Sequence, residues 1–294
     1  MFEGTYTALI TPFSKGQLDL TSFRHLVRAQ IKGGVDGIVP AGTTGESPTL
    51  SPDEHLAIIK TAVDVADHQA QVIAGTGANS TKKAIHLTQD AEKLGADASL
   101  QVTPYYNKPS QEGLFRHFRA IACDTKLPII LYSIPGRCSI PIEVPTVLRL
   151  KKACPNIVGI KEAGGDVDRI SQLRQALGPR FTILSGDDAL TLPFLSVGAN
   201  GVISVASNLL PGPVSRIVRL YQEGRSTEAL ELHQRLYPLF KDLFMETNPV
   251  PIKTAMALTG RIEPGFRLPL SPMEKTNLAQ LKRTLKGLKI RVKD

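Results

Sequence analysis

The sequence predicts a closed (β/α)₈ barrel followed by a C-terminal group of helices. Three observations indicate this fold: short apolar runs recur eight times, amphipathic helical patterns separate them, and a long stretch remains after the last run. A barrel of this kind takes about 250 residues and leaves room for an appendage in a chain of this length. We therefore expect a barrel over residues 1–224 and a helical bundle over 225–294 packed on it.

The predicted strands are apolar or β-branched runs that start roughly 20 to 35 residues apart, which is the pitch of a repeated βα unit. Runs that are apolar on both faces are typical of a parallel sheet covered by helices. Because eight such units follow in series, a closed barrel is favoured over an open, doubly wound sheet. The runs are Tyr6–Ile10, Gly37–Pro40, Val72–Gly75, Ala98–Val102, Ile129–Ser133, Ile157–Lys161, Phe181–Ser185 and Gly201–Val205.

The segments between these runs have apolar residues at helical spacing, and several begin with a capping signal. Ser51 precedes a proline and stands three residues before Glu54, which predicts a helix N-terminus with a capping box. Ser80 and Ser110 open two further helices in a similar way. Apolar stripes over 229–240, 251–258 and 273–288 predict the helices of the C-terminal bundle.

Composition excludes several classes of protein. Hydrophobic residues make up 42% of the chain, which is enough for a sizeable core, and no apolar run is long enough to span a membrane. The net charge is +8, but much of it falls on the last predicted helix without interleaved aromatic residues, so we expect no nucleic-acid or membrane partner. Three distant cysteines and the lack of a signal peptide pattern predict a cytoplasmic protein with reduced thiols.

Lys161 is the least expected residue of the predicted strands, because it ends an apolar run. Catalytic groups of such barrels lie at the carboxyl ends of the strands. Side chains alternate along a strand, so Ile157, Gly159 and Lys161 share one face; if Val158 and Ile160 meet the helices, Lys161 points into the barrel. Burial there would lower the pKa of the amine and make it a nucleophile that forms a Schiff base with a carbonyl. A solvated strand-end lysine is the alternative.

Two loops at strand ends carry groups that suit an anion. The turn 42–47 (GTTGES) offers backbone N–H groups and the hydroxyls of Thr43 and Thr44 to a carboxylate or phosphate. Arg137, after the fifth strand, has a planar guanidinium suited to a carboxylate. An ordinary turn and a surface charge are the alternatives.

Tyrosines also gather at strand ends. Tyr105 and Tyr106 follow the fourth strand, and Tyr132 lies on the fifth, next to the strand of Lys161. A phenol beside an imine could transfer protons while the imine forms and breaks down. A core tyrosine with a bonded hydroxyl is the alternative.

These motifs keep the order and approximate spacing of one protein family. The chain resembles the dihydrodipicolinate synthases, within the pyruvate-dependent class I aldolase superfamily, along essentially its whole length. The residues that carry the resemblance are Gly42–Ser47, Thr103–Asn107, Tyr132 with Pro135–Arg137, Gly159–Ala163, Leu184–Asp188 and Asn248–Lys253.

The resemblance implies a condensation of pyruvate with L-aspartate 4-semialdehyde, on the route to diaminopimelate and lysine. Lys161 would form an imine with the ketone of pyruvate, and loss of a methyl proton would give an enamine. Tyr132 would handle protons at the imine. Thr43 would link Tyr132 to Tyr106, which comes from the neighbouring subunit of a tight dimer. The implied assembly is a homotetramer of two such dimers.

The resemblance also implies the substrate-binding groups. Thr44 would hold the carboxylate of pyruvate, and Arg137 would receive the carboxylate of the semialdehyde. The carbonyl groups of Gly186 and Ile203 would lie near the bound intermediate. Two further positions depart from the family, which more often has Asn and Thr where this chain has Ser133 and Cys138.

Some family members are inhibited by lysine, and the resemblance indicates where that site lies. Inhibited members commonly have a glutamate at the position of Lys83 and often a histidine at that of Pro52. Because a cation at Lys83 would repel lysine, we expect weak or absent inhibition. The corresponding positions are Ser47, Pro48, Pro52, His55, Asn79, Lys83 and Tyr105.

Two other functions stay open at this point. An N-acetylneuraminate lyase or a 2-keto-3-deoxy sugar acid aldolase would share Lys161 and Tyr132 but generally not Arg137. A catalytically silent barrel is expected to lack Lys161, Tyr132 or the threonine pair, all of which are present. The six histidines show no metal-ligand spacing, and an imine supplies its own electron sink, so we expect neither a metal nor a cofactor.

Overall fold

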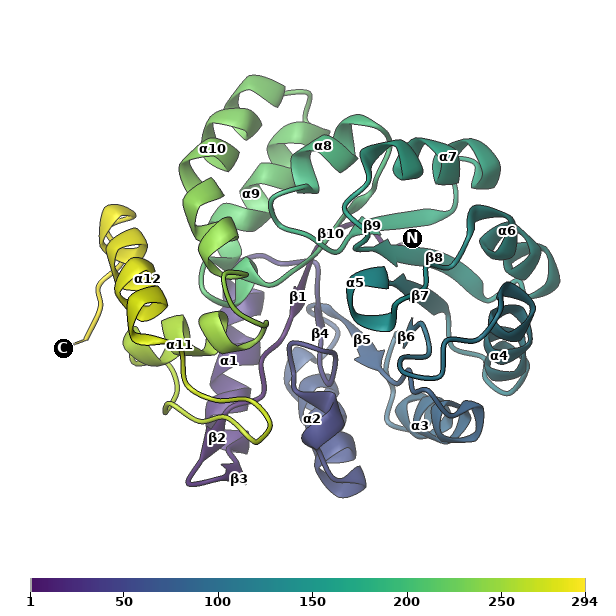
Figure 1. Cartoon of the computed structure of the whole chain (residues 1–294), viewed down its shortest axis with the longest axis horizontal. Coiled ribbons are helices and arrows are strands. Elements are labelled where there is room, and N and C mark those ends of the chain that lie inside the picture. Colours follow the sequence, from purple (N-terminus) through teal and green to yellow (C-terminus); the bar gives the residue numbers. More distant parts are fainter. Residues whose placement is uncertain (1, 294) are drawn as a thin grey trace.

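The computed structural model describes residues 2–293, and eight parallel strands form its closed barrel (Figure 1). The first strand closes the barrel by pairing with both the last and the second, so that Tyr6 lies beside Ile203 on one side and Gly37 on the other. Each predicted run overlaps a strand whose ends differ by two residues at most, which confirms the predicted fold. The barrel strands are β1 (Gly4–Ala8), β4 (Gly37–Val39), β5 (Gln71–Gly75), β6 (Ala98–Val102), β7 (Ile129–Ser133), β8 (Ile157–Glu162), β9 (Thr182–Ser185) and β10 (Gly201–Ser204).

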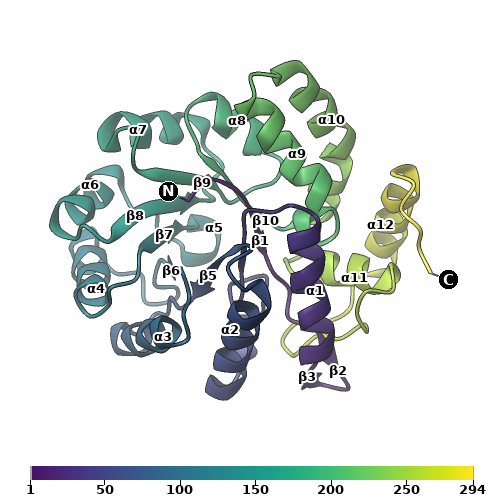
Figure 2. The same cartoon turned by 180° about the vertical axis from the view of Figure 1, so that it is seen from behind.

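A helix follows each barrel strand and covers the outside of the barrel (Figures 1 and 2). The predicted caps are confirmed: Ser51 and Glu54 form a capping box, and the Ser80 and Ser110 side chains accept hydrogen bonds from their first turns. The helices are α1 (Leu20–Lys32), α2 (Pro52–Ala66), α3 (Thr81–Lys93), α4 (Gln111–Cys123), α6 (Val144–Ala153), α7 (Val167–Leu177), α8 (Thr191–Ser196) and α9 (Pro211–Gln222).

Three further helices end the chain: α10 (Ser226–Asp242), α11 (Val250–Leu258) and α12 (Lys275–Gly287). In both views α12 lies at the edge of the molecule, where it packs against α10 and α11 (Figures 1 and 2). Buried residues of these helices, such as Leu236, Ile252 and Leu281, belong to the same hydrophobic cluster as Leu9 and Ile10 of the first βα loop. The C-terminal helices are therefore continuous with the core of the barrel.

Five short elements in the loops were not predicted. The strands β2 (Phe13–Ser14) and β3 (Gln17–Leu18) form an antiparallel hairpin after β1. The others are η1 (Ser47–Thr49), α5 (Pro135–Cys138) and η2 (Ala206–Asn208), which follow β4, β7 and β10. Elements of two to four residues are too short to show a hydrophobic period, which explains why the sequence does not reveal them.

Candidate active site

A β-bulge in β8 decides where Lys161 points. Ile129 of β7 pairs with Ile157, but Ile130 pairs with Gly159, so Val158 is an extra residue in β8. Ile157 and Ile160 both pack among the helix-facing residues, whereas Val158 packs against the cluster inside the barrel. The predicted alternation is therefore wrong for Ile157 and Val158. It holds again after the bulge, where Ile160 faces the helices and Lys161 faces the interior.

Lys161 is 6% exposed, which rules out the solvated lysine. Its Nζ atom lies 4.2 Å from the centre of the Tyr132 ring, on the neighbouring strand in direct register. Burial lowers the pKa of the amine to about 7, the nearby charge of Asp188 opposes this shift, and that of Arg137 adds to it. An appreciable fraction of the amine is thus unprotonated, and nucleophilic, near neutral pH.

Tyr132 is buried, and its phenol is kept protonated by its surroundings. Desolvation raises the pKa of the phenol well above its ordinary value, while Arg137 and a hydrogen bond with the Thr43 side chain act in the opposite direction. A protonated phenol next to an amine can donate a proton to an oxygen that leaves the reacting carbon.

The turn after β4 brings Thr43 and Thr44 to the same place. The backbone N–H groups of Gly45 and Ser47 donate to the carbonyl of Gly42 at 3.1 and 3.3 Å, which closes the turn. The turn packs tightly on β5: a Cβ atom on Gly75 would lie 2.4 Å from the Ala41 carbonyl oxygen, so only glycine fits there.

These groups line one small cavity of about 40 Å³ at the carboxyl ends of the strands. The two threonines, the phenol and the buried amine therefore meet around one space. Its walls are formed by Ala8, Val39, Ala41, Gly42, Thr43, Thr44, Ser47, Gly75, Gly77, Leu100, Val102, Tyr132 and Lys161.

Arg137, Gly186 and Ile203 lie near this cavity without lining it. Arg137 is exposed on α5, and its Nη2 atom donates to the backbone carbonyl of Asn248 at 2.8 Å. A Cβ atom on Gly186 would lie 3.0 Å from Cε of Lys161, so the glycine backbone packs directly on the lysine stem. Ile203 is buried in the interior cluster that also contains Tyr132.

Tyr106 is the one predicted catalytic residue that this chain does not bring to the cavity. It is 92% exposed and has a φ of +74°, in the left-handed region that is uncommon for a tyrosine.

The two positions that depart from the resembled family are both buried. The Cys138 thiol donates to the Thr103 carbonyl at 3.1 Å, and the Ser133 hydroxyl accepts from the Ile142 N–H at 3.5 Å.

A second cavity of about 60 Å³ shares Ser47, Gly75 and Gly77 with the first. It brings together six of the seven positions expected for a lysine site: Ser47, Pro48, Pro52, His55, Lys83 and Tyr105. The seventh, Asn79, is adjacent, because its side chain donates to the Tyr105 carbonyl at 3.3 Å. The Nε2 atom of His55 lies 2.8 Å from the Gly75 carbonyl, and burial together with the charge of Lys83 lowers the pKa of this histidine.

Two residues near the site had no role assigned from the sequence, although both stand in motifs that carry the resemblance. Asp188 is buried and accepts hydrogen bonds from the Ser204 hydroxyl at 2.5 Å and from two backbone N–H groups after β10; its burial raises the pKa of the carboxyl to about 6. Asn248 comes from the C-terminal segment, and its amide Nδ2 donates to the Thr44 hydroxyl at 3.0 Å. In the sequence, the only signal for Asp188 and Asn248 is their place in these motifs.

Within residues 2–293, no group of three or more histidine, cysteine, aspartate or glutamate side chains is placed to hold a metal ion. Over the same residues, the structure contains no helix with the length and hydrophobicity needed to traverse a lipid bilayer.

Comparisons with known proteins identify the family of this chain. The sequence pattern of the Dihydrodipicolinate synthetase family matches residues 1–288. The chain belongs to this family. It is 53% identical over 287 residues to the 4-hydroxy-tetrahydrodipicolinate synthase of Persephonella marina, covering 97% of this chain and 98% of that protein.

Solved structures of the family superpose closely on this chain. The synthase from Methylacidiphilum fumariolicum SolV is 60% identical, with a TM-score of 0.97 over 98% of this chain and 96% of the other. The chloride-inhibited dihydrodipicolinate synthase of Acinetobacter baumannii, complexed with pyruvate, is 43% identical, with a TM-score of 0.96 over 99% and 100% of the two chains.

Proposed function

We propose that this protein is a 4-hydroxy-tetrahydrodipicolinate synthase, which condenses pyruvate with L-aspartate 4-semialdehyde through an imine on Lys161. One observation carries the proposal: a buried lysine amine, with a pKa lowered to about 7, lies 4.2 Å from the ring of a buried tyrosine beside two threonine hydroxyls. Relatives of the same family, about half identical over nearly their whole length, bear this name.

The first half of the reaction uses the groups around the cavity. The neutral amine of Lys161 attacks the ketone carbon of pyruvate, and a C–N bond forms while the carbonyl oxygen takes up a proton. A second proton, supplied through Tyr132, lets this oxygen leave as water and gives the imine. Thr44 holds the pyruvate carboxylate by its hydroxyl and backbone N–H. Loss of a methyl proton then gives an enamine, and no cofactor is needed because the imine nitrogen accepts the electron pair.

The second half joins the two substrates. The enamine carbon attacks the aldehyde carbon of the semialdehyde, whose oxygen becomes a hydroxyl. The amino group of the semialdehyde then attacks the imine carbon and displaces the amine of Lys161, which closes the ring and frees the enzyme. Arg137 receives the semialdehyde carboxylate at the mouth, and the carbonyl groups of Gly186 and Ile203 lie near the intermediate.

The proton relay extends beyond one chain in this proposal. Thr43 connects Tyr132 to Tyr106 of a neighbouring subunit, which accords with the exposed position of Tyr106 in its own chain. We propose a tight dimer, two of which form a homotetramer. We also propose a cytoplasmic location, in keeping with the free thiols of Cys123, Cys138 and Cys154, and a division into a barrel over 1–224 and a bundle over 225–294.

A sugar-acid aldolase of the same superfamily is the second candidate function. Arg137 argues against it, because a guanidinium at the mouth suits a second carboxylate better than a chain of hydroxyls. Parallel assays with aspartate semialdehyde plus pyruvate and with N-acetylneuraminate would separate the two. Cleavage of N-acetylneuraminate without condensation would contradict the proposal.

The experiment that tests the nucleophile is borohydride reduction in the presence of pyruvate, followed by peptide mass mapping. The pyruvyl adduct is expected on the peptide of Lys161 and to disappear in Lys161→Ala. Lys253 serves as an internal control, because it is buried even more fully but pairs with Glu46 and does not line the cavity. An adduct on Lys253, or none, would contradict the mechanism.

A further inference from the structure

Asn248 contacts both of the groups that are proposed to bind substrate carboxylates. It lies between α10 and α11 and is 7% exposed. Its side-chain Nδ2 donates to Thr44 Oγ1 at 3.0 Å, and its backbone carbonyl accepts from Arg137 Nη2 at 2.8 Å. Thr44 and Arg137 follow strands that are not neighbours in the barrel, so a residue from the C-terminal segment joins the two.

The contact with Thr44 determines how that hydroxyl can act. A hydroxyl has a single proton to donate and two lone pairs that accept. Because the Asn248 amide donates to one lone pair, the Thr44 proton must point elsewhere. Among residues 2–293, Asn248 is the sole side chain hydrogen-bonded to the Thr44 hydroxyl, so its proton stays available to a ligand in the cavity.

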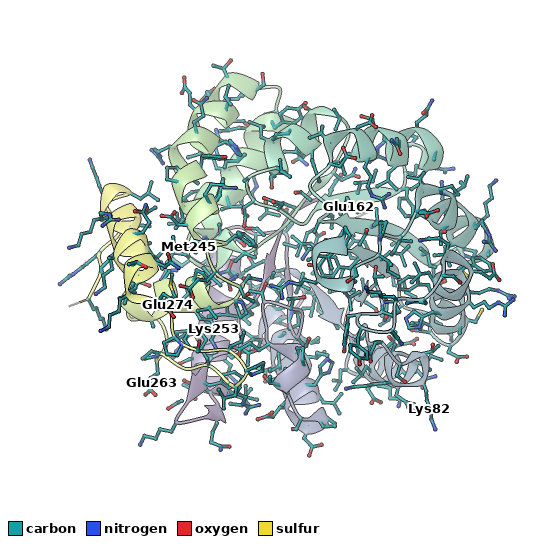
Figure 3. All side chains as sticks on the ribbon, viewed as in Figure 1. Lys82, Glu162, Met245, Lys253, Glu263 and Glu274 are labelled. Atoms are coloured by element: carbon teal, nitrogen blue, oxygen red, sulfur yellow. The ribbon has the colours of Figure 1, made fainter. Side chains whose placement is uncertain are left out.

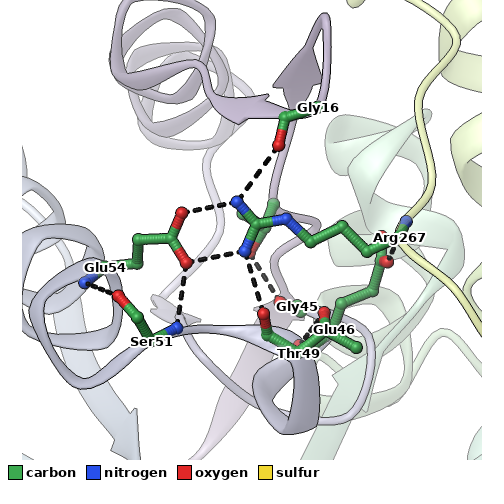
Figure 4. Close-up of polar contacts among 8 residues, drawn as sticks. Gly16, Gly45, Glu46, Thr49, Ser51, Glu54 and Arg267 are labelled. Atoms are coloured by element: carbon green, nitrogen blue, oxygen red, sulfur yellow. Dashed lines mark hydrogen bonds and ion pairs between the residues drawn. The ribbon is translucent and has the colours of Figure 1, made fainter.

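The C-terminal segment that carries Asn248 also contacts the turn 42–47 and the residues that follow it. Lys253 on α11 forms an ion pair with Glu46, and both side chains are 1% exposed (Figure 3 labels Lys253). Arg267 binds both carboxylate oxygens of Glu54, at 2.5 and 2.6 Å, and donates to the Thr49 carbonyl at 2.9 Å (Figure 4). These contacts hold the C-terminal segment against residues 46–54, which begin two residues after Thr44.

We propose that Asn248 is a positioning residue that orients the Thr44 hydroxyl to donate to the carboxylate of the keto acid, and that ties this subsite to Arg137. The inference rests on the proposed function. It gives the Asn248–Lys253 motif a role in the chemistry of the barrel, whereas a purely structural role would affect folding alone.

The test measures the pyruvate concentration that gives half-maximal borohydride trapping on Lys161. Asn248→Ala should raise it about tenfold, because the Thr44 hydroxyl loses the donor that orients it. Asn248→Asp, which has nearly the same shape, should raise it by about a hundredfold, because a carboxylate accepts the Thr44 proton and repels the substrate. Trapping rates at saturating pyruvate should fall by less than about twofold, since the amine is untouched.

A double-mutant cycle with Thr44→Val separates orientation from general damage. Once the hydroxyl is absent, Asn248→Ala should change the half-saturating concentration by less than about twofold. Asn277→Ala is the matched control, because its amide donates to Glu246 at 2.8 Å within the C-terminal segment; it should leave trapping at the wild-type value. Thermal melts of all variants report folding.

Each outcome decides the inference. A wild-type half-saturation in both Asn248 variants, or the same tenfold rise in the Thr44→Val background, would overturn it while leaving the proposed function intact. Failure of the wild-type protein to trap pyruvate at all would overturn the proposed function and, with it, this inference.

Discussion

The Nζ atom of Lys161 lies 4.2 Å from the centre of the Tyr132 ring, with the two residues paired across adjacent parallel strands. Neither side chain is more than 6% exposed. Water therefore cannot solvate the ammonium form well. The amine faces the ring of Tyr132, whose phenol stays protonated because it is buried. The two groups that the reaction needs, a free amine and a proton donor, arise from the same burial.

The pH dependence of imine formation should report this burial. Because the pKa of Lys161 is lowered to about 7, the neutral fraction rises about tenfold between pH 6 and pH 8 and changes little above pH 9. Initial rates of pyruvate trapping with cyanoborohydride should follow this curve. A lysine-containing peptide, as a control, should keep gaining rate toward pH 10. A protein rate that also climbs to pH 10 would contradict a desolvated amine.

Replacing the nucleophile should make the protein more stable. The pKa of Lys161 is about 7 when folded and about 10.5 when unfolded, so between these values the unfolded chain binds one more proton and folding is penalised. Lys161→Met should raise the free energy of unfolding by a few kcal/mol at pH 7, and the gain should shrink as the pH approaches 10.5. Denaturant unfolding at both pH values checks this. The exposed Lys82→Met is the control and should change little (Figure 3); a destabilised Lys161→Met at pH 7 would count against the burial argument.

Arg137→Ala should impair the use of aspartate semialdehyde but not the trapping of pyruvate. Trapping of pyruvate should continue, because the guanidinium does not line the cavity of Lys161. The kcat/KM for aspartate semialdehyde should fall about a hundredfold, as expected for the loss of a charged hydrogen-bond donor to a carboxylate. Arg116→Ala, an exposed arginine on α4, should leave both measurements unchanged. Equal losses in trapping and turnover would place Arg137 on pyruvate instead.

Replacing only Lys253 of the buried ion pair with Glu46 should lower the free energy of unfolding more than replacing both residues. Lys253→Met leaves the Glu46 carboxylate buried without its partner and should cost about 3–5 kcal/mol of unfolding free energy. Adding Glu46→Gln should restore a good part of this loss. Lys60→Met breaks the exposed pair with Asp64 and should cost less than about 1 kcal/mol. A double variant less stable than Lys253→Met alone would show that the charge is not the cause.

Lysine should inhibit the enzyme weakly or not at all, because Lys83 lines the second cavity and repels an ammonium group. Turnover at pH 8 should stay above half of its maximum with lysine at millimolar concentration. Lys83→Glu reverses the charge and should create inhibition, which makes it the positive control. Half-inhibition of the wild-type protein by sub-millimolar lysine would refute the prediction.

The sequence predicted the barrel and much of the site because both depend on patterns that are local. Eight apolar runs define the strands, and strand ends in a barrel converge, so Thr43, Thr44, Tyr132 and Lys161 meet around one cavity. The bulge at Val158 could not be predicted, since strict alternation is the assumption by which a strand is interpreted.

Contacts between residues far apart in the sequence could not be predicted from local patterns either. Asn248 reaches Thr44 across 204 positions of the chain, and nothing in the spacing of its motif fixes that distance. Tyr106 was expected to act across a dimer only on the strength of the family resemblance. Its exposure in this chain is compatible with that role, which a second copy of the protein would have to complete.

The bulge in β8 determines on which side of the barrel wall the side chain of Lys161 lies. Val158 has no polar atom in its side chain, yet the single register step that it adds decides on which side of the barrel wall the next residues emerge. If Val158 instead continued a regular alternation from Ile157, the sequence would keep every chemical group of the site. Ile160 would then face the interior of the barrel, and the amine of Lys161 would face the helices, away from Tyr132 and the two threonines.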